Sequence, residues 1–306
     1  MFDAYFLEFD LNMKKADHIF ETASDKLDVA ALELYTLESA GMFESSEDPD
    51  EMFSESAEKF IDAIKAFFKK IKDAIKKLYL SVKDAIENAI RKHEMKKKLK
   101  ELRDTIKNSQ EMQKSLGTSN SEITDTTKLY KAYCEYMDTM MKQTRQVYSK
   151  TYDNVDDYND AIKKANDTLA EKADSLNMTV SDKAMVSMKF GEAFKFTEKE
   201  SDNIAKLTEM YVKKWTSSTD ELEKLVLAQD DASKISDLKG IVSKANSIMS
   251  QGLRKIESSW QKNYKTIIAA AAAVASAAGV VGGALGVKAY KNGKAADAAL
   301  ADIEAL

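Results

Sequence analysis

Few side chains in this sequence have the types and spacing that catalysis or metal binding requires. His18 and His93 lie far apart in the chain and have no cysteine or carboxylate framework, whereas a zinc site needs three or four such ligands. Cys134, the only cysteine, cannot form an intrachain disulfide, and its place on an apolar helical seam favours a buried, inert thiol over a nucleophile. No glycine-rich phosphate loop or serine-centred elbow is present.

One group of carboxylates is close enough in sequence to be weighed as a cation site. It consists of Asp153, Asp156, Asp157 and Asp160. The glycine turn and the terminal glutamate of an EF-hand are missing around them, so a solvated helix face is the simpler interpretation. We therefore expect a protein that is not an enzyme and that binds no cofactor or metal ion.

The remaining chemistry is electrostatic and resides in lysines. On a helical wheel, one flank of an apolar stripe carries Lys65, Lys69, Lys72, Lys76 and Lys83, and the following basic run 91–103 adds Lys96, Lys97, Lys98 and Lys100. Such side chains can contact phosphates, but no aromatic residues are interleaved with the basic run, which argues against base-specific recognition. A basic amphipathic helix also suits an anionic membrane surface, and a solvated basic face paired to the acidic N-terminal arm is the third interpretation.

The element that must position these lysines is a helix predicted over residues 57–103. Apolar residues recur there at steps of three and four, namely Ile61, Ile64, Phe68, Ile71, Ile75, Leu78, Val82 and Ile86. No glycine or proline interrupts the segment. The helix therefore offers an apolar stripe and a cationic edge together, and it needs a partner for the stripe.

Charge is segregated along the chain. Residues 1–58 carry a net charge of −13 and residues 59–103 a net charge of +9, although the whole chain is only at −5. The acidic, serine-rich segment 44–56 contains the only proline, Pro49, and has the composition of a linker or cleavable boundary. We predict an acidic arm over 1–58, a long-helix bundle over 59–265 and an apolar helix with a tail over 266–306.

Further helices are predicted beyond the basic run. A seven-residue spacing through Cys134, Met141, Tyr148, Val155, Ile162, Leu169 and Leu176 predicts one long, coiled-coil-like helix over 122–176. Residues 177–196 are ambiguous between a small hairpin and an irregular helix. Thr197 with Glu200 has the pattern of a capping box that opens the next helix, and a last long helix begins near Asp231. The fold class is therefore all-α, an elongated bundle of long amphipathic helices.

The segment 267–287 contains 21 residues without a charge, nine of them alanine and four glycine. Its length matches the roughly 20 residues that cross a bilayer. Aromatic residues flank it (Trp260, Tyr264 and Tyr290), and small-residue spacing within it would allow close helix packing (Gly279, Gly282, Gly283 and Gly286). Membrane insertion, close packing in a protein assembly and a flexible tail all remain open, because alanine and glycine favour insertion only weakly.

Two stretches carry a resemblance to a known family. The acidic LESAGMFESSE (Leu37–Glu47) followed by EKFIDAIKAFFKKIKDAIKKL (Glu58–Leu78) resembles the opening of internal head and other virion structural proteins of large tailed bacteriophages. Members of that family often carry a propeptide that is removed after a small-x-Glu tripeptide, which here implies processing at Glu47 or Glu58. The resemblance covers about a quarter of the chain and implies a place inside the capsid.

Two functions follow as expectations. The leading one is a non-enzymatic virion structural or assembly protein whose basic helix contacts the genome, neighbouring subunits or other virion proteins. The alternative is a membrane-anchored or pore-forming helical protein that inserts residues 267–287. A scaffold-like coiled-coil oligomer without contact to genome or lipid is a third.

Overall fold

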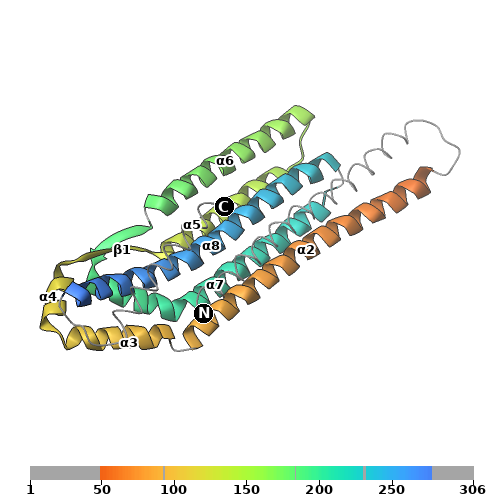
Figure 1. The fold of residues 1–306 in the computed structure, drawn as a ribbon. Helices are drawn as coiled ribbons and strands as arrows, with labels where there is room; N and C mark the ends of the chain where they lie inside the picture. Colours follow the sequence, from red (N-terminus) through yellow and green to blue (C-terminus); the bar gives the residue numbers. More distant parts are fainter. Residues whose placement is uncertain (1–48, 92–93, 183, 230–231, 278–306) are drawn as a thin grey trace, which may run out of the picture. The chain divides into compact units, whose positions relative to one another are not determined.

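The computed structural model describes residues 49–91, 94–182, 184–229 and 232–277. These residues form seven helices and one two-stranded sheet, so the predicted all-α fold class is confirmed (Figure 1). In chain order the elements are α2 (Pro49–Arg91), α3 (Glu94–Lys107), α4 (Gln110–Thr118), β1 (Asn120–Thr124), α5 (Thr126–Tyr148), α6 (Val155–Asp182), β2 (Met185–Lys189), α7 (Phe190–Leu227) and α8 (Ala232–Ala277).

The described chain divides into two units that do not follow the predicted domain boundaries. Unit 1 contains α2 up to Ala85, Tyr130–Thr179 and Leu207–Arg254, and unit 2 contains Ile86–Leu129, Val180–Lys206 and α8 from Lys255 onward. Helices α5, α7 and α8 each contribute residues to both units. The predicted boundaries at 58/59 and 265/266 fall inside α2 and α8 respectively.

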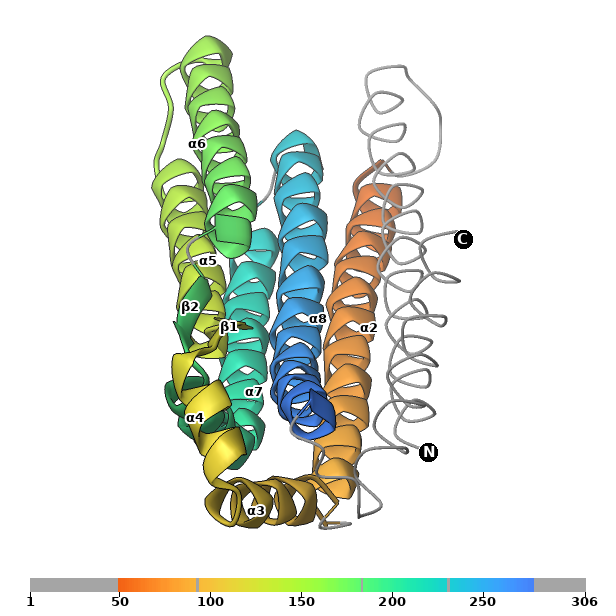
Figure 2. The same ribbon diagram turned by 60° about the vertical axis from the view of Figure 1, so that its left-hand side comes forward.

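Unit 1 is a bundle of helices joined by an apolar core. Figures 1 and 2 show α2 and α6 at opposite sides of this unit, with α7 and α8 between them and α5 beside α6. The apolar stripe of α2 is buried at Ile64, Phe67, Phe68, Ile71, Ala74, Ile75 and Leu78. Two buried hydrogen bonds join α7 to α8: Trp215 Nε1 donates to Asn246 Oδ1 (2.7 Å) and Tyr211 Oη donates to the Met249 carbonyl (2.8 Å).

Unit 2 is built around the small sheet. Strands β1 and β2 are antiparallel, with Asn120 opposite Lys189 and Thr124 opposite Met185. Ser109 caps α4, since its hydroxyl accepts from the Met112 amide, as expected of serine at a helix N-terminus. The ambiguous segment 177–196 thus contains a strand, but that strand pairs with β1 rather than forming a local hairpin.

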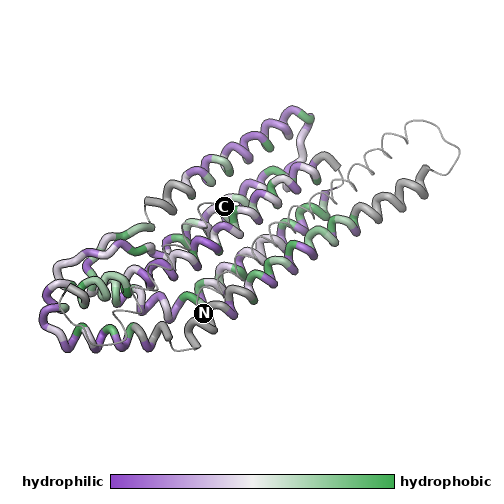
Figure 3. The backbone as a smooth tube through the Cα atoms, viewed as in Figure 1, coloured by the Kyte–Doolittle hydropathy of each residue, from purple (hydrophilic) through white to green (hydrophobic). Residues whose placement is uncertain are grey.

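The last predicted helix is confirmed almost residue by residue. Its predicted core positions are all buried in α8: Ile235, Leu238, Val242, Ala245, Met249, Leu253, Ile256, Trp260 and Tyr264. The tube in Figure 3 shows apolar and polar residues alternating along the helices, as a repeat of three and four residues requires.

The prediction of a single helix over 122–176 is wrong. Residues 120–124 are strand β1, and residues 149–154 separate α5 from α6. Asn154 starts α6, because its Oδ1 accepts from the Asp157 amide (2.8 Å), and this cap leaves the predicted seam residue Val155 72% exposed. The seven-residue spacing identified most of the buried side chains, but it did not show that the chain breaks between them.

The helix limits predicted around the basic segment are also wrong. Helix α2 begins at Pro49, where proline is tolerated because a first-turn amide has no helical partner. It ends at Arg91, and α3 begins at Glu94, so the predicted helix over 57–103 is two helices. Residues 92–93 lie outside the described chain.

Candidate functional site

The lysines of α2 lie on the side of the helix that faces away from the apolar core of unit 1. The apolar stripe centred on Ile64, Ile71 and Ile75 is at most 1% exposed, whereas Lys65, Lys69, Lys76 and Lys83 are exposed. Residues 61–84 hold seven lysines against three aspartates. Among the described residues, no carboxylate lies within ion-pair distance of Lys69 or Lys76, and the Lys65 ammonium lies 3.7 Å from Asp62 on the same helix.

Lys72 has a different role from its neighbours. Its Nζ lies 2.7 Å from Glu223 Oε2 and 3.3 Å from Asp220 Oδ1, so it attaches α2 to α7 within unit 1. The hydrogen bond to Glu223 raises the Lys72 pKa above its ordinary value, despite the opposing effect of partial burial. Lys72 therefore stabilises the packing of α2 on α7, and it is not part of the predicted cationic surface.

We expect Lys72→Met to lower the free energy of unfolding by about 1 kcal/mol, because it removes two partly exposed ion pairs. The matched control is Lys76→Met, one turn further along the same helix, which should change the stability by less than about 0.5 kcal/mol. Urea denaturation of the two variants measures the difference. Equal stabilities would show that the Lys72 ion pairs do not hold α2 in place.

The second part of the predicted basic surface is on α3, in unit 2. Lys97 and Lys100 are exposed, and Lys97 lies 3.8 Å from Glu101 on the same helix. Lys96 and Lys98 belong to α3, but their side chains lie outside the described part. Arg103, at the end of the basic run, pairs with Glu198 and its guanidinium lies 5.7 Å from the centre of the Phe194 ring. The α3 lysines thus form a separate group from those of α2.

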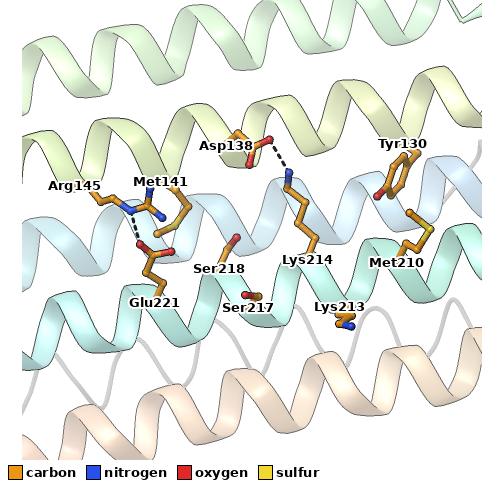
Figure 4. Close-up of a pocket in the computed structure, with 10 residues that line it drawn as sticks. All are labelled: Tyr130, Asp138, Met141, Arg145, Met210, Lys213, Lys214, Ser217, Ser218 and Glu221. Carbon is orange, nitrogen blue, oxygen red and sulfur yellow. Dashed lines mark hydrogen bonds and ion pairs between the residues drawn. The ribbon is translucent and has the colours of Figure 1, made fainter.

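An open groove of about 700 Å³ lies between α5 and α7 in unit 1 (Figure 4). Two of its three cations are paired within the groove: Lys214 Nζ lies 2.6 Å from Asp138, and Arg145 pairs with Glu221. The Arg145 guanidinium holds the pKa of the Glu221 carboxyl below its ordinary value. Lys213 is the third cation in the lining, so the groove keeps a net charge of only +1 and attracts an anionic ligand weakly.

Cys134, on α5 in unit 1, is buried, as the sequence predicts. Burial raises the pKa of its thiol above the ordinary value, which keeps it protonated at neutral pH. The pKa of the adjacent Tyr130 is likewise raised by desolvation, to about 12. A protonated, buried thiol is a poor nucleophile, which agrees with the expected inert role.

A buried polar cluster in unit 2 contains the two residues of the predicted capping box, Thr197 and Glu200. Thr197 and Glu200 were predicted to cap a helix, but both lie inside α7, which begins at Phe190. Glu200 Oε1 instead accepts hydrogen bonds from the amide (3.0 Å) and hydroxyl of Thr126, the first residue of α5. The carboxylate therefore caps another helix from a distance of 74 residues in sequence.

Asn263 of α8 completes this cluster. Its Nδ2 donates to Glu200 Oε2 (2.8 Å) and to the Thr124 carbonyl (2.6 Å), while its Oδ1 accepts from the Thr124 amide (2.7 Å). One amide side chain thus imitates the pairing of a neighbouring strand at the end of β1. The Thr197–Glu200 pattern indicates a carboxylate that accepts a hydrogen bond from a helix N-terminus. The sequence does not show which helix that is.

The first part of the apolar segment packs as an ordinary helix face. Ile267 and Ala271 are fully buried in α8, in line with the buried Trp260 and Tyr264. Among the described residues, no helix is long and apolar enough to cross a membrane. The segment beyond Ala277 lies outside the described chain, and with it Gly279, Gly282, Gly283, Gly286 and Tyr290.

The two predicted processing sites differ in position. Glu47 lies outside the described residues, whereas Glu58 lies within α2. Proteolytic nicking favours exposed loop tips, so cleavage after Glu58 requires that this part of α2 be unwound first.

In the part of the chain that the structure describes, no group of three or more histidine, cysteine, aspartate or glutamate side chains could hold a metal ion. The site that remains is the set of exposed lysines on α2 in unit 1. Comparison with known proteins adds no identity: no family model, no curated protein sequence and no solved structure matches this chain.

Proposed function

We propose that this protein is a non-enzymatic helical structural protein that binds a nucleic acid without reading its sequence, through the exposed lysines of α2. The observation that carries the proposal is the division of that helix into two faces. Its apolar stripe is buried in the core of unit 1, while Lys65, Lys69, Lys76 and Lys83 remain exposed.

The spacing of these lysines suits a polyanion. From Lys65 to Lys83 the helix rises about 27 Å, at 1.5 Å per residue. A duplex carries one phosphate charge per about 1.7 Å of its axis, so each lysine has a phosphate within reach whatever the sequence. Flexible lysine ammonium groups act as point charges, which favours contacts with the backbone over bidentate recognition of bases.

The biological setting rests on the resemblance of residues 37–47 and 58–78 to virion structural proteins of tailed bacteriophages. In that setting the polyanion is the packaged genome and the protein lies inside the head. Mass spectrometry of purified particles tests this part separately, and absence of the protein from the virions would contradict it.

The binding test compares two variants with the same change in net charge. In the α2 variant, Lys69, Lys76 and Lys83 are each changed to glutamate. In the control variant the same change is made at three exposed lysines of unit 1 that lie outside α2, namely Lys131, Lys142 and Lys150.

We expect the α2 variant to bind duplex DNA at least about tenfold more weakly than the wild type at low salt. The slope of log affinity against log salt should also fall by about 2.7, which corresponds to three lost phosphate contacts. Fluorescence anisotropy with two unrelated DNA sequences measures both quantities. Equal weakening in the control variant, or wild-type binding to anionic vesicles but not to DNA, would overturn the proposal.

A further inference from the structure

A second stripe of charge, opposite in sign, lies on α6 in unit 1. Helix α6 is mostly hydrophilic along its length (Figure 3), and its buried side is formed by Tyr158, Ala165, Leu169 and Leu176. Its solvent side carries six exposed carboxylates, Asp156, Asp157, Asp160, Asp167, Glu171 and Asp174, against two exposed lysines, Lys163 and Lys164, so the acidic charge prevails. Among the described residues, none of these six carboxylates is joined by an ion pair to a lysine or arginine.

The two stripes match in spacing. On α6, Asp160, Asp167 and Asp174 are seven residues apart, and on α2, Lys69, Lys76 and Lys83 are seven residues apart as well. Each set spans 14 residues, or about 21 Å of helix, and seven residues are close to two turns. Both sets are exposed, so two such helices laid side by side would bring three lysines opposite three aspartates.

Within one copy these stripes cannot meet. Helices α2 and α6 lie at opposite sides of unit 1, with α7 and α8 between them and α5 beside α6 (Figures 1 and 2). The contacts agree with this order, since Lys72 joins α2 to α7, and Lys172 of α6 lies 3.8 Å from Glu135 of α5. Among the described residues, the complementary surface is therefore out of reach within one copy and comes from another molecule.

We propose that the α6 carboxylates of one copy dock on the α2 lysines of a second copy of this chain. Because the two surfaces differ and lie on opposite sides, the contact is heterologous and repeats from copy to copy, giving open chains rather than closed dimers. Leu80, which is 46% exposed between Lys76 and Lys83, adds an apolar contact at the centre of the surface.

The strength of the contact follows from its exposure. An exposed ion pair strengthens an association only about two- to fivefold, so three pairs supply about ten- to a hundredfold together. Association is therefore weak in dilute solution, sensitive to salt, and favoured where the protein is concentrated. The same lysines take part in the proposed nucleic-acid binding, so DNA and a second copy exclude one another on α2.

Complementation between two charge-reversed chains tests the docking. One chain carries Lys69, Lys76 and Lys83 changed to glutamate, and the other carries Asp160, Asp167 and Asp174 changed to lysine. In sedimentation velocity at low salt, the wild type should give particles that grow with concentration, and each variant alone should remain monomeric. An equimolar mixture should associate again, because the acidic α2 of the first chain meets the basic α6 of the second, and the unchanged α6 of the first meets the unchanged α2 of the second.

Association in the mixture also shows that both variants are folded. A wild type that stays monomeric at low salt, a fixed dimer, or a mixture that does not associate would each overturn the proposal. The DNA measurement separates this result from the proposed function. The α6 variant should keep DNA binding while losing self-association. A wild type that self-associates but does not bind DNA would overturn the proposed function alone.

Discussion

Gly252→Ala should lower the free energy of unfolding by about 2–3 kcal/mol, although it adds a single methyl group. Gly252 is buried in α8, and a Cβ built there would lie 2.2 Å from Tyr211 Oη and 2.6 Å from Tyr133 Cδ1. Neither ring can retreat easily, because Tyr133 and Tyr211 are at most 1% exposed. Relief of the clash would also disturb the Tyr211 hydrogen bond to the Met249 carbonyl.

Gly240→Ala is the matched control for this substitution. It lies in the same helix, is exposed, and has no atom within 4 Å of the added Cβ. Alanine is the better helix former, so this variant should gain about 0.5–1 kcal/mol. Urea denaturation of both variants gives the comparison. A Gly252→Ala protein as stable as wild type would show that α5 and α7 do not approach α8 as closely as the structure has them.

The second large effect is expected at Glu200. Glu200→Ala removes the acceptor for the Thr126 amide and hydroxyl and for Asn263 Nδ2, all within unit 2. Leaving buried donors without a partner costs about 1–3 kcal/mol for each neutral group, so we expect a loss of about 3 kcal/mol in the free energy of unfolding. Glu192→Ala, an exposed position on the same helix, should change it by less than about 0.5 kcal/mol.

Glu200 also predicts an unusual pH dependence. Desolvation raises its pKa above the ordinary 4.5, although the hydrogen bonds from Thr126 and Asn263 oppose the shift and nearby Asp125 adds to it. The folded protein therefore holds the proton of this carboxyl at a higher pH than the unfolded chain does. The contribution of Glu200 to stability is thus greatest below about pH 4.5 and falls as the pH rises through the folded-state pKa.

This sign is the reverse of that for a carboxylate in an ion pair. Glu200→Gln, which cannot titrate, isolates it: the stability of the wild type relative to this variant should decrease between about pH 4.5 and neutrality. Chemical denaturation of both proteins across this range measures the difference. A relative stability that rises with pH would contradict the desolvated environment of Glu200.

Much of the buried core could be predicted from the sequence. All the positions that the period in α8 identified from Ile235 to Tyr264 are buried, although it missed Ile241, and the period in α2 identified Ile64, Phe68 and Ile71. These predictions succeed because an apolar residue at every third or fourth position can be buried only on one helix face. Cys134 was predicted correctly for the same reason.

The breaks between helices could not be predicted from the same pattern. The seven-residue spacing runs through residues 149–154, yet α5 ends at Tyr148 and Asn154 caps α6. A periodic pattern shows which side chains are apolar. It does not reveal a loop when the apolar residues after the loop continue the same seven-residue spacing. The Asn154–Asp157 spacing was the local signal of a helix start.

The residue types and their periodicity were thus enough to predict the all-α class, the buried face of each long helix and the run of lysines along α2. The use of the polar residues became visible only in the folded chain, because partners far apart in sequence must be brought together by packing. Packing assigned Lys72 to an ion pair with α7, Glu200 to the first turn of α5, and Asn263 to the end of β1. The exposed lysines of α2 and the carboxylates of α6 remain on the surface of the protein, because neither group takes part in packing the core.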